Sequence, residues 1–542
     1  MPRRTQGWAA LVGLVSVAGG FALAELLSLM LAPSSSTVYA VGSFAVDITP
    51  SWAKDAAIAL FGTNDKIFLF VVLGLIFAAI AALAGRLELT RPPWGSALLI
   101  VFGALAVYAV ATREQFVVLW LLPTVLGLLA AIVLLRMLTA RLRTWVVAAT
   151  APEPSAPTAP AGATPEARMT PAQESVLTQR AAPSRRGFLT LLAGTAAGAV
   201  VVGAGARLAN NAANAATAAV ERVREIFRLP QPATAAPPVP AGAALEVEGV
   251  SDLVTPNEEF YRIDTALQVP AVDPETWRLR IVGMVEEEVE ISFAELLDLP
   301  LTETTITLMC VSNPVGGDLI GNAVWLGYPI RELLARARPL AGADMVLSRS
   351  VDGFTASTPL EILEDPDRDC LLAVGMNGEL LPPEHGFPVR MVVPGLYGYV
   401  SATKWVTELR VTTFEEDTAY WTDRGWSAMG PIKIGSRIDV PTSGSRLAAG
   451  TVPVAGVAWA QHTGISGVEV RIDEGEWQAA TLAPAISEDT WVQWVHQWQA
   501  EPGTHQIEVR AIDATGEVQS GQNVQVVPDG AEGWHAVRVN VS

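Results

Sequence analysis

The sequence TLMCVSNPVGGDLIGNAVW, at residues 307–325, decides how the C-terminal half of this chain folds. Thr304–Met309, at its start, is β-branched and apolar, which predicts a buried strand. From Val311 onward, Asn, Pro and Gly predict a loop with unusual backbone angles. Cys310 therefore stands at the boundary of strand and loop, where side chains reach ligands. From spacing alone it is either a buried thiol that packs as a small hydrophobe or a ligand or nucleophile.

The composition sets limits on the class of protein. The chain has 542 residues, half of them hydrophobic, and its mean hydropathy of +0.34 is too high for a purely soluble protein. Several domains are expected at this length. A formal charge of −19, without a large basic patch, excludes nucleic acid as a partner. Two cysteines exclude a disulfide framework and a four-cysteine metal site, and no Cys-x-x-Cys-His motif for haem attachment occurs.

Four apolar stretches are long enough to span a bilayer. Arginines lie before the first, between the second and third, and after the fourth, which predicts that both ends face the cytoplasm. No histidine lies in these stretches, which excludes a bis-histidine haem. Residues 1–145 are thus expected to form a four-helix transmembrane anchor, with spans at Trp8–Leu31, Ile67–Gly85, Trp94–Ala111 and Phe116–Leu135.

Glu25 is the one acidic residue well inside a predicted span. Two interpretations are open: a carboxylate on a proton or ion path, or a carboxylate near the membrane interface. The loop after this span contains SFAVDITPSWAKDAAIALFG at residues 43–62. We expect it to lie along the outer surface as a short amphipathic helix.

A linker and a fifth helix are expected after the bundle. Residues 146–184 are rich in Ala, Pro, Thr and Glu and predict a disordered linker. Residues 185–208 begin Arg-Arg-Gly-Phe-Leu and continue as an apolar run, which resembles a twin-arginine export signal on a fifth transmembrane helix. The alternative is an ordinary fifth helix with basic flanks. Both interpretations put the later residues outside the cytoplasm, and export of a folded tail would favour a complex cofactor in it. Residues 209–244 predict a helix and a Pro/Ala-rich spacer.

Residues 245–426 mix short strands with a few helices. They contain no Gly-x-Gly-x-x-Gly or P-loop motif, which excludes a Rossmann-type nucleotide site. The expected strands are Trp277–Gly283, Thr304–Met309, Met345–Ser350 and Pro388–Val393, and the expected helices are Phe293–Leu297 and Ile330–Ala337.

Residues 427–542 alternate apolar and polar residues between turn sequences, which predicts an all-β, immunoglobulin-like sandwich. Trp491, Trp494 and Trp498 are expected in its core or at a subunit interface. The expected strands are Val452–Ala458, Gly467–Ile472, Trp491–Trp498, His505–Asp513 and Asn523–Val527.

Four segments resemble, in order and spacing, the sulfite oxidase family of molybdopterin enzymes, and most of all its bacterial membrane-anchored members. They are TPNEEFYRIDTALQVP (255–270), TLMCVSNPVGGDLIGNAVWLGYPI (307–330), SVDGFTASTPL (350–360) and LLAVGMNGELLPPEHGFPVRMVVPGLYGYVSATKWV (371–406). The resemblance covers about residues 245–542. The membrane half lies outside it. The resemblance implies an α+β sulfite-oxidase-type molybdopterin domain at 245–426 and an immunoglobulin-like dimerisation domain at 427–542, so that, with the N-terminal α-helical membrane bundle predicted from the apolar stretches, a multidomain chain is expected.

The resemblance also implies a Mo-molybdopterin cofactor and roles for matching residues. Cys310 matches the cysteine whose thiolate binds molybdenum, and a soft sulfur ligand suits that metal. Each match also has an ordinary interpretation: Arg390, for example, could simply pair with Glu384 or Glu408. Cys370 matches no family role and is expected to be a buried structural thiol. The residues that match cofactor contacts are Tyr261, Arg262, Ser350, His385, Arg390, Thr403 and Lys404.

Three departures from the family bear on the substrate. Sulfite oxidases have an arginine pair shortly after the ligand cysteine, but here Pro314 and Val315 follow Asn313. Their tyrosine near the molybdenum is replaced by Phe354, and the arginine–histidine pair after Phe-Tyr is altered, with Asp264 nearby. A pocket without these cations is expected to bind sulfite poorly.

The function implied is therefore a membrane-anchored, extracytoplasmic molybdenum oxidoreductase, with Cys310 and Phe354 at its catalytic centre. It would transfer an oxygen atom or two electrons on a small oxyanion, sulfoxide or N-oxide. The chain has no haem or iron–sulfur motif, so a separate cytochrome or quinone-linked partner is expected to exchange electrons. A homodimer through the C-terminal domain is a further expectation. The alternative function is a non-catalytic membrane scaffold or binding protein that retains the molybdopterin fold.

Overall fold

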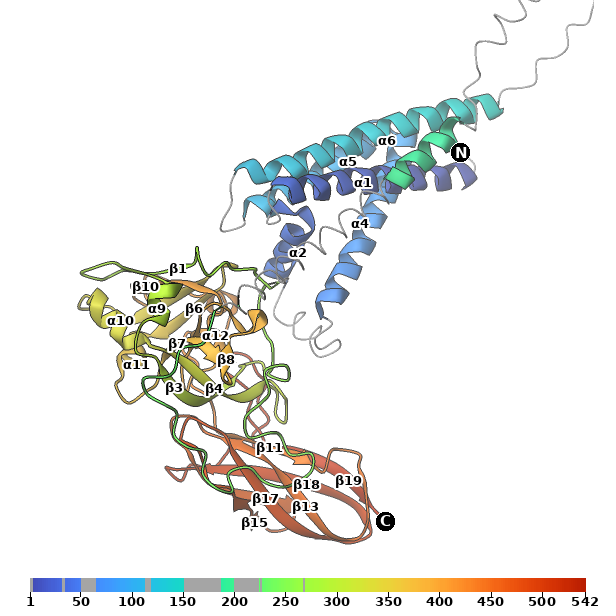
Figure 1. Ribbon diagram of the computed structural model, residues 1–542. Coiled ribbons are helices and arrows are strands. Elements are labelled where there is room, and N and C mark those ends of the chain that lie inside the picture. The colour runs from blue at the N-terminus through green and yellow to red at the C-terminus, as the bar shows by residue number, and fades with distance from the viewer. Residues whose placement is uncertain are drawn as a thin grey trace, which may run out of the picture. The chain divides into compact units, whose positions relative to one another are not determined.

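The computed structural model describes residues 3–31, 35–49, 65–112, 118–150, 187–198, 224, 227–266 and 269–542. The chain divides into two units, Met1–Ala215 and Ala216–Ser542. The first is helical and the second is mostly β (Figure 1). The Arg185–Arg186 pair lies outside the described residues, as does most of the expected linker.

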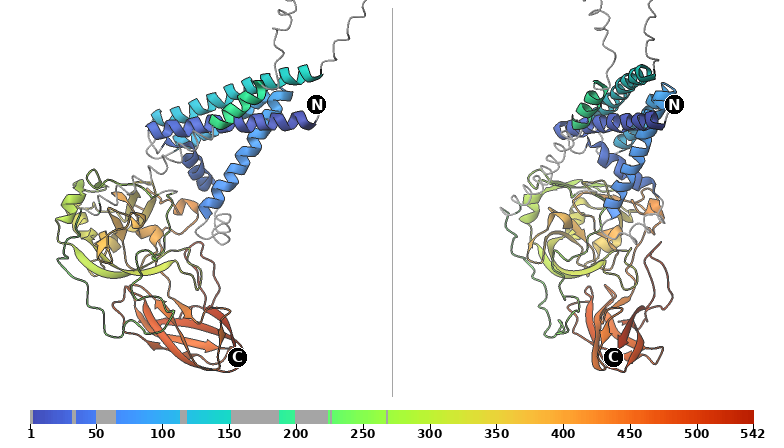
Figure 2. Two further views of the ribbon diagram at one scale, coloured as in Figure 1. Left: turned by 45° about the vertical axis from the view of Figure 1, so that its right-hand side comes forward. Right: turned by 90° about the vertical axis from the view of Figure 1, so that its right-hand side faces the viewer.

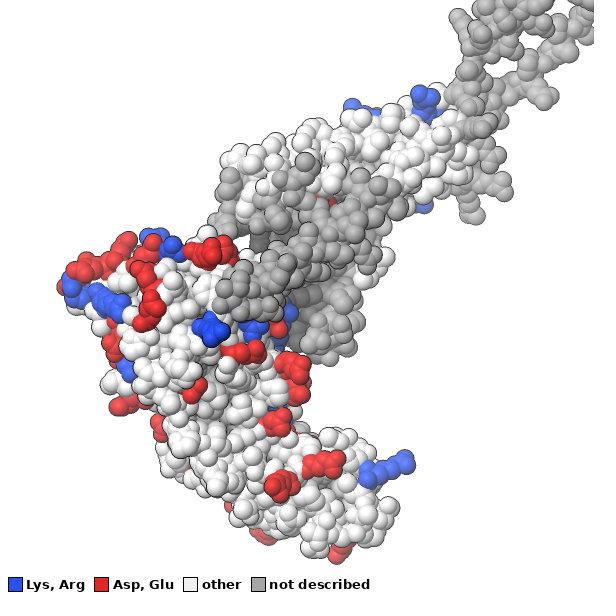
Figure 3. All heavy atoms as spheres, in the orientation of Figure 1, with Lys and Arg blue, Asp and Glu red and all other residues white. Residues whose placement is uncertain are grey.

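The helical unit contains four helices that are long and apolar enough to cross a membrane, in agreement with the four predicted spans. The face in Figure 3 shows few charged side chains on these helices, as contact with hydrocarbon requires. A shorter apolar helix, Gly187–Gly198, is the described part of the expected fifth helix. The other bounds are α1 Arg3–Leu31, α2 Thr37–Ile48, α4 Asp65–Thr90, α5 Trp94–Ala111, the turn η3 Val118–Trp120 and α6 Leu121–Thr150, which extends past the expected boundary at residue 145.

Glycines allow the long helices to approach closely. Helix α6 lies alongside α1 (Figure 1, Figure 2), and a Cβ added at Gly20 would collide with the carbonyl oxygen of Gly127. In the same way, a Cβ at Gly13 of α1 would collide with the carbonyl oxygen of Ala81 in α4. Such backbone-to-backbone packing is typical of helices in membranes, where burial of apolar surface does not drive association.

Glu25 contacts the start of helix α2. Its carboxylate accepts hydrogen bonds from Ser36 Oγ at 2.8 Å and from the backbone N–H of Val38 at 3.2 Å. Helix α2, Thr37–Ile48, covers only the first residues of the segment 43–62 in which a helix is expected, and residues 50–64 lie outside the described residues. The contacts give the carboxylate a structural partner at this end of α1.

The central domain is built on two sheets. In one, of order β2-β1-β10-β5-β6, strand β1 (Arg278–Gly283) runs parallel to β10 (Val406–Thr412). In the other, β3 (Thr302–Met309), β4 (Ile320–Pro329), β7 (Leu371–Met376) and β8 (Glu379–Leu380) are neighbours, and β9 (Arg390–Val392) pairs with β7. The remaining elements are β2 Val289–Ser292, α9 Phe293–Leu297, α10 Ile330–Ala337, β5 Met345–Ser350, β6 Thr355–Pro359, α11 Leu360–Glu364, η4 Pro383–His385, α12 Gly398–Ser401 and η5 Thr422–Arg424.

The C-terminal domain is a sandwich of two sheets, β11-β13-β17-β16 and β12-β19-β18-β14-β15. Trp494 and Trp498 are buried in its core, as expected. The strands are β11 Gly435–Val440, β12 Arg446–Leu447, β13 Gly450–Trp459, β14 Ile465–Ile472, β15 Gln478–Ala479, β16 Thr481–Leu482, β17 Val492–Ala500, β18 Gly503–Asp513 and β19 His535–Val541.

One predicted strand is wrong. Asn523–Val527 forms only an isolated bridge between Val524 and Glu532, and β19 supplies the last strand of the sheet instead. The apolar alternation at 523–527 runs directly into Pro528, which has no N–H to donate to a ladder.

The two β domains are joined through the edge of β3. The backbone N–H of Thr307 donates to Asp489 O at 3.0 Å, and Thr307 Oγ1 accepts from the N–H of Trp491 at 2.8 Å. The indole Nε1 of Trp491 donates to Leu253 O at 2.9 Å, and its ring is buried in the core of the central domain. The strand that leads to Cys310 is therefore held from the C-terminal domain.

Trp491 is expected to contribute to the stability of both domains. Trp491→Ala leaves a cavity and is expected to cost about 3–5 kcal/mol, whereas Trp491→Phe loses mainly the indole hydrogen bond and costs about 1 kcal/mol. Thermal unfolding of the full chain in detergent measures the two variants. Equal melting temperatures for Trp491→Ala and the unchanged chain would contradict the prediction.

Candidate active site

Cys310 follows the last residue of β3 and opens the loop 310–319. Met309 of β3 pairs with Ile320 of β4, and the N–H of Cys310 donates to Leu319 O at 2.9 Å. These contacts hold the first and last residues of the loop next to each other. Inside the loop, Asn313 Oδ1 accepts from the N–H of Leu319 at 2.9 Å. Burial raises the pKa of the Cys310 thiol, although a hydrogen bond from Ser312 opposes the shift. A free thiol here would remain protonated, and a bound metal would remove its proton.

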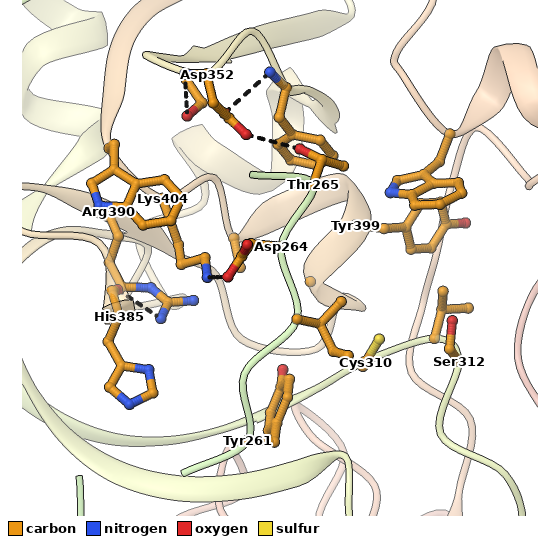
Figure 4. A pocket seen from close by; sticks show the side chains of 18 of the residues that line it. Tyr261, Asp264, Thr265, Cys310, Ser312, Asp352, His385, Arg390, Tyr399 and Lys404 are labelled. Carbon is orange, nitrogen blue, oxygen red and sulfur yellow. Dashed lines mark hydrogen bonds and ion pairs between the residues drawn. The ribbon is translucent and has the colours of Figure 1, made fainter. Parts of the chain in front are cut away.

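Cys310 opens onto a pocket of about 900 Å³, a volume that includes solvent at the mouth of the pocket. Figure 4 shows its sulfur between two groups of side chains. His385, Arg390 and Lys404 lie on one side, and Ser312 and Tyr399 lie on the other.

His385 is held as a neutral hydrogen-bonding group. Its Nε2 lies 2.8 Å from the carbonyl oxygen of Asn257, so Nε2 carries the proton and Nδ1 is the acceptor. Burial and the charge of Arg390 lower the pKa of His385 to about 4. The next residue, Gly386, has a φ of +117°, and a Cβ there would lie 2.9 Å from the Cβ of Arg390. Glycine thus allows the His-Gly-Phe-Pro-Val-Arg turn to bring both polar side chains into one pocket.

Arg390 is a buried cation without a carboxylate partner among the described residues. It is 6% exposed, its Nη1 donates to His385 O at 3.1 Å, and its guanidinium lies over the ring of Trp325 at 5.0 Å. The alternative role for Arg390, an ordinary ion pair with Glu384 or Glu408, is not what the structure shows, because neither carboxylate pairs with it. Burial lowers the pKa of Arg390 to about 10, which leaves it charged at neutral pH. A buried, unpaired guanidinium is costly unless an anion binds to it.

Lys404 is the second buried cation, and it has a partner. Its Nζ donates to Asp264 Oδ2 at 2.9 Å and to Glu384 O at 3.1 Å. The same Asp264 oxygen accepts from Arg262 Nε at 2.9 Å. Burial lowers the pKa of Lys404 to about 8, against the opposing charge of Asp264.

The other side of the pocket is aromatic. Phe354, Tyr399, Trp421 and Trp426 line it, and the centroids of Tyr399 and Trp426 are 5.9 Å apart. Trp421 and Trp426 come from the segment between β10 and the C-terminal domain. Sequence reasoning missed both tryptophans, because no motif links that segment to Cys310. It also missed Tyr399, which lies in α12, within the segment 371–406, but was not matched to a role there.

Most of the residues predicted from sequence meet in this pocket. Arg262 is not in its lining; its side chain is 41% exposed and pairs with Asp264. Thr403 is buried and is also absent from the lining of the pocket; its hydroxyl shares a hydrogen bond of 2.7 Å with Ser348 Oγ. Pro314 and Val315 are also absent from the lining. The side of the pocket away from Arg390 is therefore formed by other residues, among them the aromatic ones. The predicted residues that do line the pocket are Tyr261, Cys310, Ser350, Phe354, His385, Arg390 and Lys404.

Comparison with known proteins agrees with this geometry. Residues 266–421 match the family model of the oxidoreductase molybdopterin binding domain, and residues 436–509 match that of a bacterial Ig domain. Sulfite oxidase of Gallus gallus is 31% identical over 314 residues, which cover 49% of this chain and 68% of that protein. This chain belongs to the sulfite oxidase family of molybdopterin oxidoreductases.

Two further proteins are similar to about half of this chain. Mitochondrial sulfite oxidase of Mus musculus is 30% identical over 341 residues, 53% of this chain, and the match spans 62% of the mouse protein. Among solved structures, the sulfane dehydrogenase SoxCD from Paracoccus pantotrophus is 23% identical with a TM-score of 0.47, and the match covers 55% of this chain and 85% of that chain.

The cofactor of this oxidoreductase family is Mo-molybdopterin, and the pocket fits it. A molybdopterin carries a phosphate and many hydrogen-bonding edges, and the pocket offers a buried guanidinium without a carboxylate, a second buried cation and a neutral imidazole. The buried thiol of Cys310 adds a soft ligand of the kind that binds transition metals.

Cys310→Ser is expected to abolish the molybdenum redox signal of the purified full chain, because a hydroxyl replaces the soft sulfur ligand. Electron paramagnetic resonance of partly reduced protein, with metal analysis, measures the change. Cys370→Ser is the matched control: that thiol is 1% exposed, lies outside the pocket lining and donates to Ile362 O at 3.3 Å, as a serine can. A full signal in Cys310→Ser would exclude Cys310 as the ligand.

Proposed function

We propose that this chain is a membrane-anchored, extracytoplasmic molybdenum oxidoreductase. It transfers an oxygen atom or an electron pair on a small oxyanion, sulfoxide or N-oxide. The observation that carries the proposal is the pocket in which Cys310 lies between a cationic side and an open aromatic side. One side would suit an anionic cofactor, and the other would be available to a substrate.

The side chains of the pocket have distinct tasks in this proposal. Cys310 ligates the metal, and Arg390 and Lys404 neutralise the phosphate and anionic edges of the cofactor. His385 offers Nδ1 as a hydrogen-bond acceptor to the pterin, because Nε2 is committed to Asn257. When bound, the cofactor supplies the oxygen-atom and two-electron chemistry.

Several residues act at the edge of this arrangement. Tyr261 presents a phenol whose pKa is raised, first by burial and then by the nearby Cys310, so that it remains protonated and can donate a hydrogen bond. Ser350 is a buried hydroxyl on the pocket wall. Arg262 acts through Asp264, and Thr403 through Ser348, so both are positioning residues rather than direct contacts.

Electrons are exchanged with a separate partner, a cytochrome or a quinone-linked subunit. The sequence has no haem or iron–sulfur motif, and within the described residues no group of three His, Cys, Asp or Glu could hold a metal ion. The membrane helices would keep the oxidoreductase domain close to such a partner. The immunoglobulin-like domain is a candidate for contact with a second copy of the chain.

A metal analysis and a redox screen of the purified full chain test this function. We expect about one molybdenum per chain and turnover of at least one sulfoxide, N-oxide or oxyanion with an artificial electron donor or acceptor. Molybdenum below about one-tenth of an atom per chain would favour a non-catalytic scaffold. The charges and hydrogen bonds of His385, Arg390 and Lys404 favour the enzyme, because a scaffold would not need a buried, unpaired guanidinium.

Export of the catalytic domain is tested at the arginine pair. Replacing Arg185 and Arg186 together by lysine is expected to leave the domain in the cytoplasm, since a twin-arginine signal requires arginine rather than positive charge alone. Protease added outside spheroplasts measures the accessible fraction. Unchanged accessibility would contradict the export signal, and replacement of Arg141 and Arg143 by lysine serves as a control.

A further inference from the structure

The aromatic side of the pocket is continuous. Ring centroids are 5.9 Å apart between Phe354 and Tyr420, 5.2 Å between Tyr420 and Trp421, and 6.1 Å between Trp421 and Trp426. Tyr399 extends the series at 5.9 Å from Trp426. Of these five rings, all but Tyr420 line the pocket. We refer to the four lining residues, Phe354, Tyr399, Trp421 and Trp426, as the aromatic wall.

The polar groups of this wall are the Tyr399 hydroxyl and the indole N–H groups of Trp421 and Trp426, and the indoles can only donate hydrogen bonds. The Tyr399 hydroxyl donates to Ser427 O at 2.8 Å, so its ring offers mainly a hydrocarbon face to the pocket. Phe354 has no hydroxyl, and its backbone N–H donates to Asp352 Oδ1 at 3.3 Å. Ile263, which also lines the pocket, is 46% exposed and adds an apolar side chain that solvent reaches.

The charges of the pocket are unfavourable for a second anion. Arg390 and Lys404 line the side away from Tyr399 (Figure 4), where the cofactor needs them. The lining also contains the carboxyl groups of Asp264 and Asp352. Asp352 accepts from Thr265 Oγ1 at 2.9 Å, close to Phe354 in sequence. Arg424 is close to this side, with its guanidinium 3.6 Å from the centre of the Tyr420 ring, but it donates to Tyr420 O at 2.7 Å and is not part of the lining. An oxyanion beside the aromatic wall would therefore lose its hydration without gaining a cation from the lining on that side.

We infer that the aromatic wall binds an uncharged organic oxide with hydrocarbon substituents, a sulfoxide or an amine N-oxide, and rejects inorganic oxyanions. The inference rests on the proposed function and narrows its substrate class. For a sulfoxide the step breaks the sulfur–oxygen bond: two electrons from the electron-transfer partner and two protons from solvent give the sulfide and water. Aromatic faces bind hydrocarbon substituents through dispersion and burial of apolar area.

Binding of a matched pair of redox-inert compounds tests the inference. Methyl phenyl sulfone and benzenesulfonate share a ring and a sulfonyl group but differ in charge. We expect calorimetry on the molybdenum-loaded full chain to show at least about tenfold tighter binding of the sulfone, because only the anion pays an uncompensated desolvation cost. Equal or tighter binding of benzenesulfonate would overturn the inference.

Two variants link the preference to the wall. Trp426→Ala is expected to weaken sulfone binding about tenfold or more, with Trp477→Ala in the C-terminal domain as a control of the same chemistry that leaves it unchanged. Phe354→Arg adds a cation to the wall and is expected to make benzenesulfonate bind more tightly than the sulfone. Phe354→Leu adds no charge and is expected to leave the preference for the sulfone unchanged. Molybdenum content and melting temperature identify any variant that fails to fold. An unchanged binding ratio in folded, loaded Phe354→Arg would contradict the assignment of the wall.

Turnover separates this inference from the proposed function. The loaded protein is expected to reduce methyl phenyl sulfoxide with a reduced viologen as donor, and to act on sulfite or nitrate at least about a hundredfold less efficiently in kcat/KM. Turnover of the oxyanions but not of the sulfoxide would support the proposed oxidoreductase function and overturn the inference about the aromatic wall. Absence of molybdenum and of all turnover would instead overturn the proposed function.

Discussion

The hydrogen bonds between Thr307 and the segment 489–491 are the contacts on which the site depends most. Thr307 lies on an edge strand, whose free backbone groups need partners, and the C-terminal domain supplies them through Asp489 and Trp491. Three residues further along, the same strand ends at Cys310. A domain that forms no part of the pocket wall thus fixes the direction from which the thiol enters the pocket.

The second constraint is the burial of positive charge. Lys404 is compensated by Asp264, but Arg390 has only carbonyl oxygens and the Trp325 ring among the described residues. Burial of such a group is unfavourable unless a bound ligand compensates for the loss of hydration. The buried guanidinium therefore explains why the central domain is built to bind an anionic cofactor, and the closed loop around Cys310 explains where its metal would lie.

The two sides of the pocket come from different parts of the chain and do different physical work. The cationic side consists of His385 in the η4 turn, Arg390 in β9 and Lys404 just before β10, which lie within about twenty residues of each other in the sequence. The aromatic wall joins Phe354, from the turn between β5 and β6, to Tyr399 and to two tryptophans beyond β10. In the proposed function, the cationic side would hold the cofactor and the aromatic wall would select the substrate, although Tyr399 lies between Arg390 and Lys404 in the sequence.

The sequence by itself determined the local elements and the cofactor side of the site. Apolar runs predicted the four membrane helices, and β5, α9 and α10 have the predicted bounds, because periodicity and the Ser292 capping box are local properties. Only the tertiary structure decided that Asp264 pairs with Lys404, that Asn523–Val527 is not a strand, and that Trp421 and Trp426 line the same pocket as Cys310. These depend on contacts between distant segments, whose pairing leaves no periodic pattern or motif in the chain.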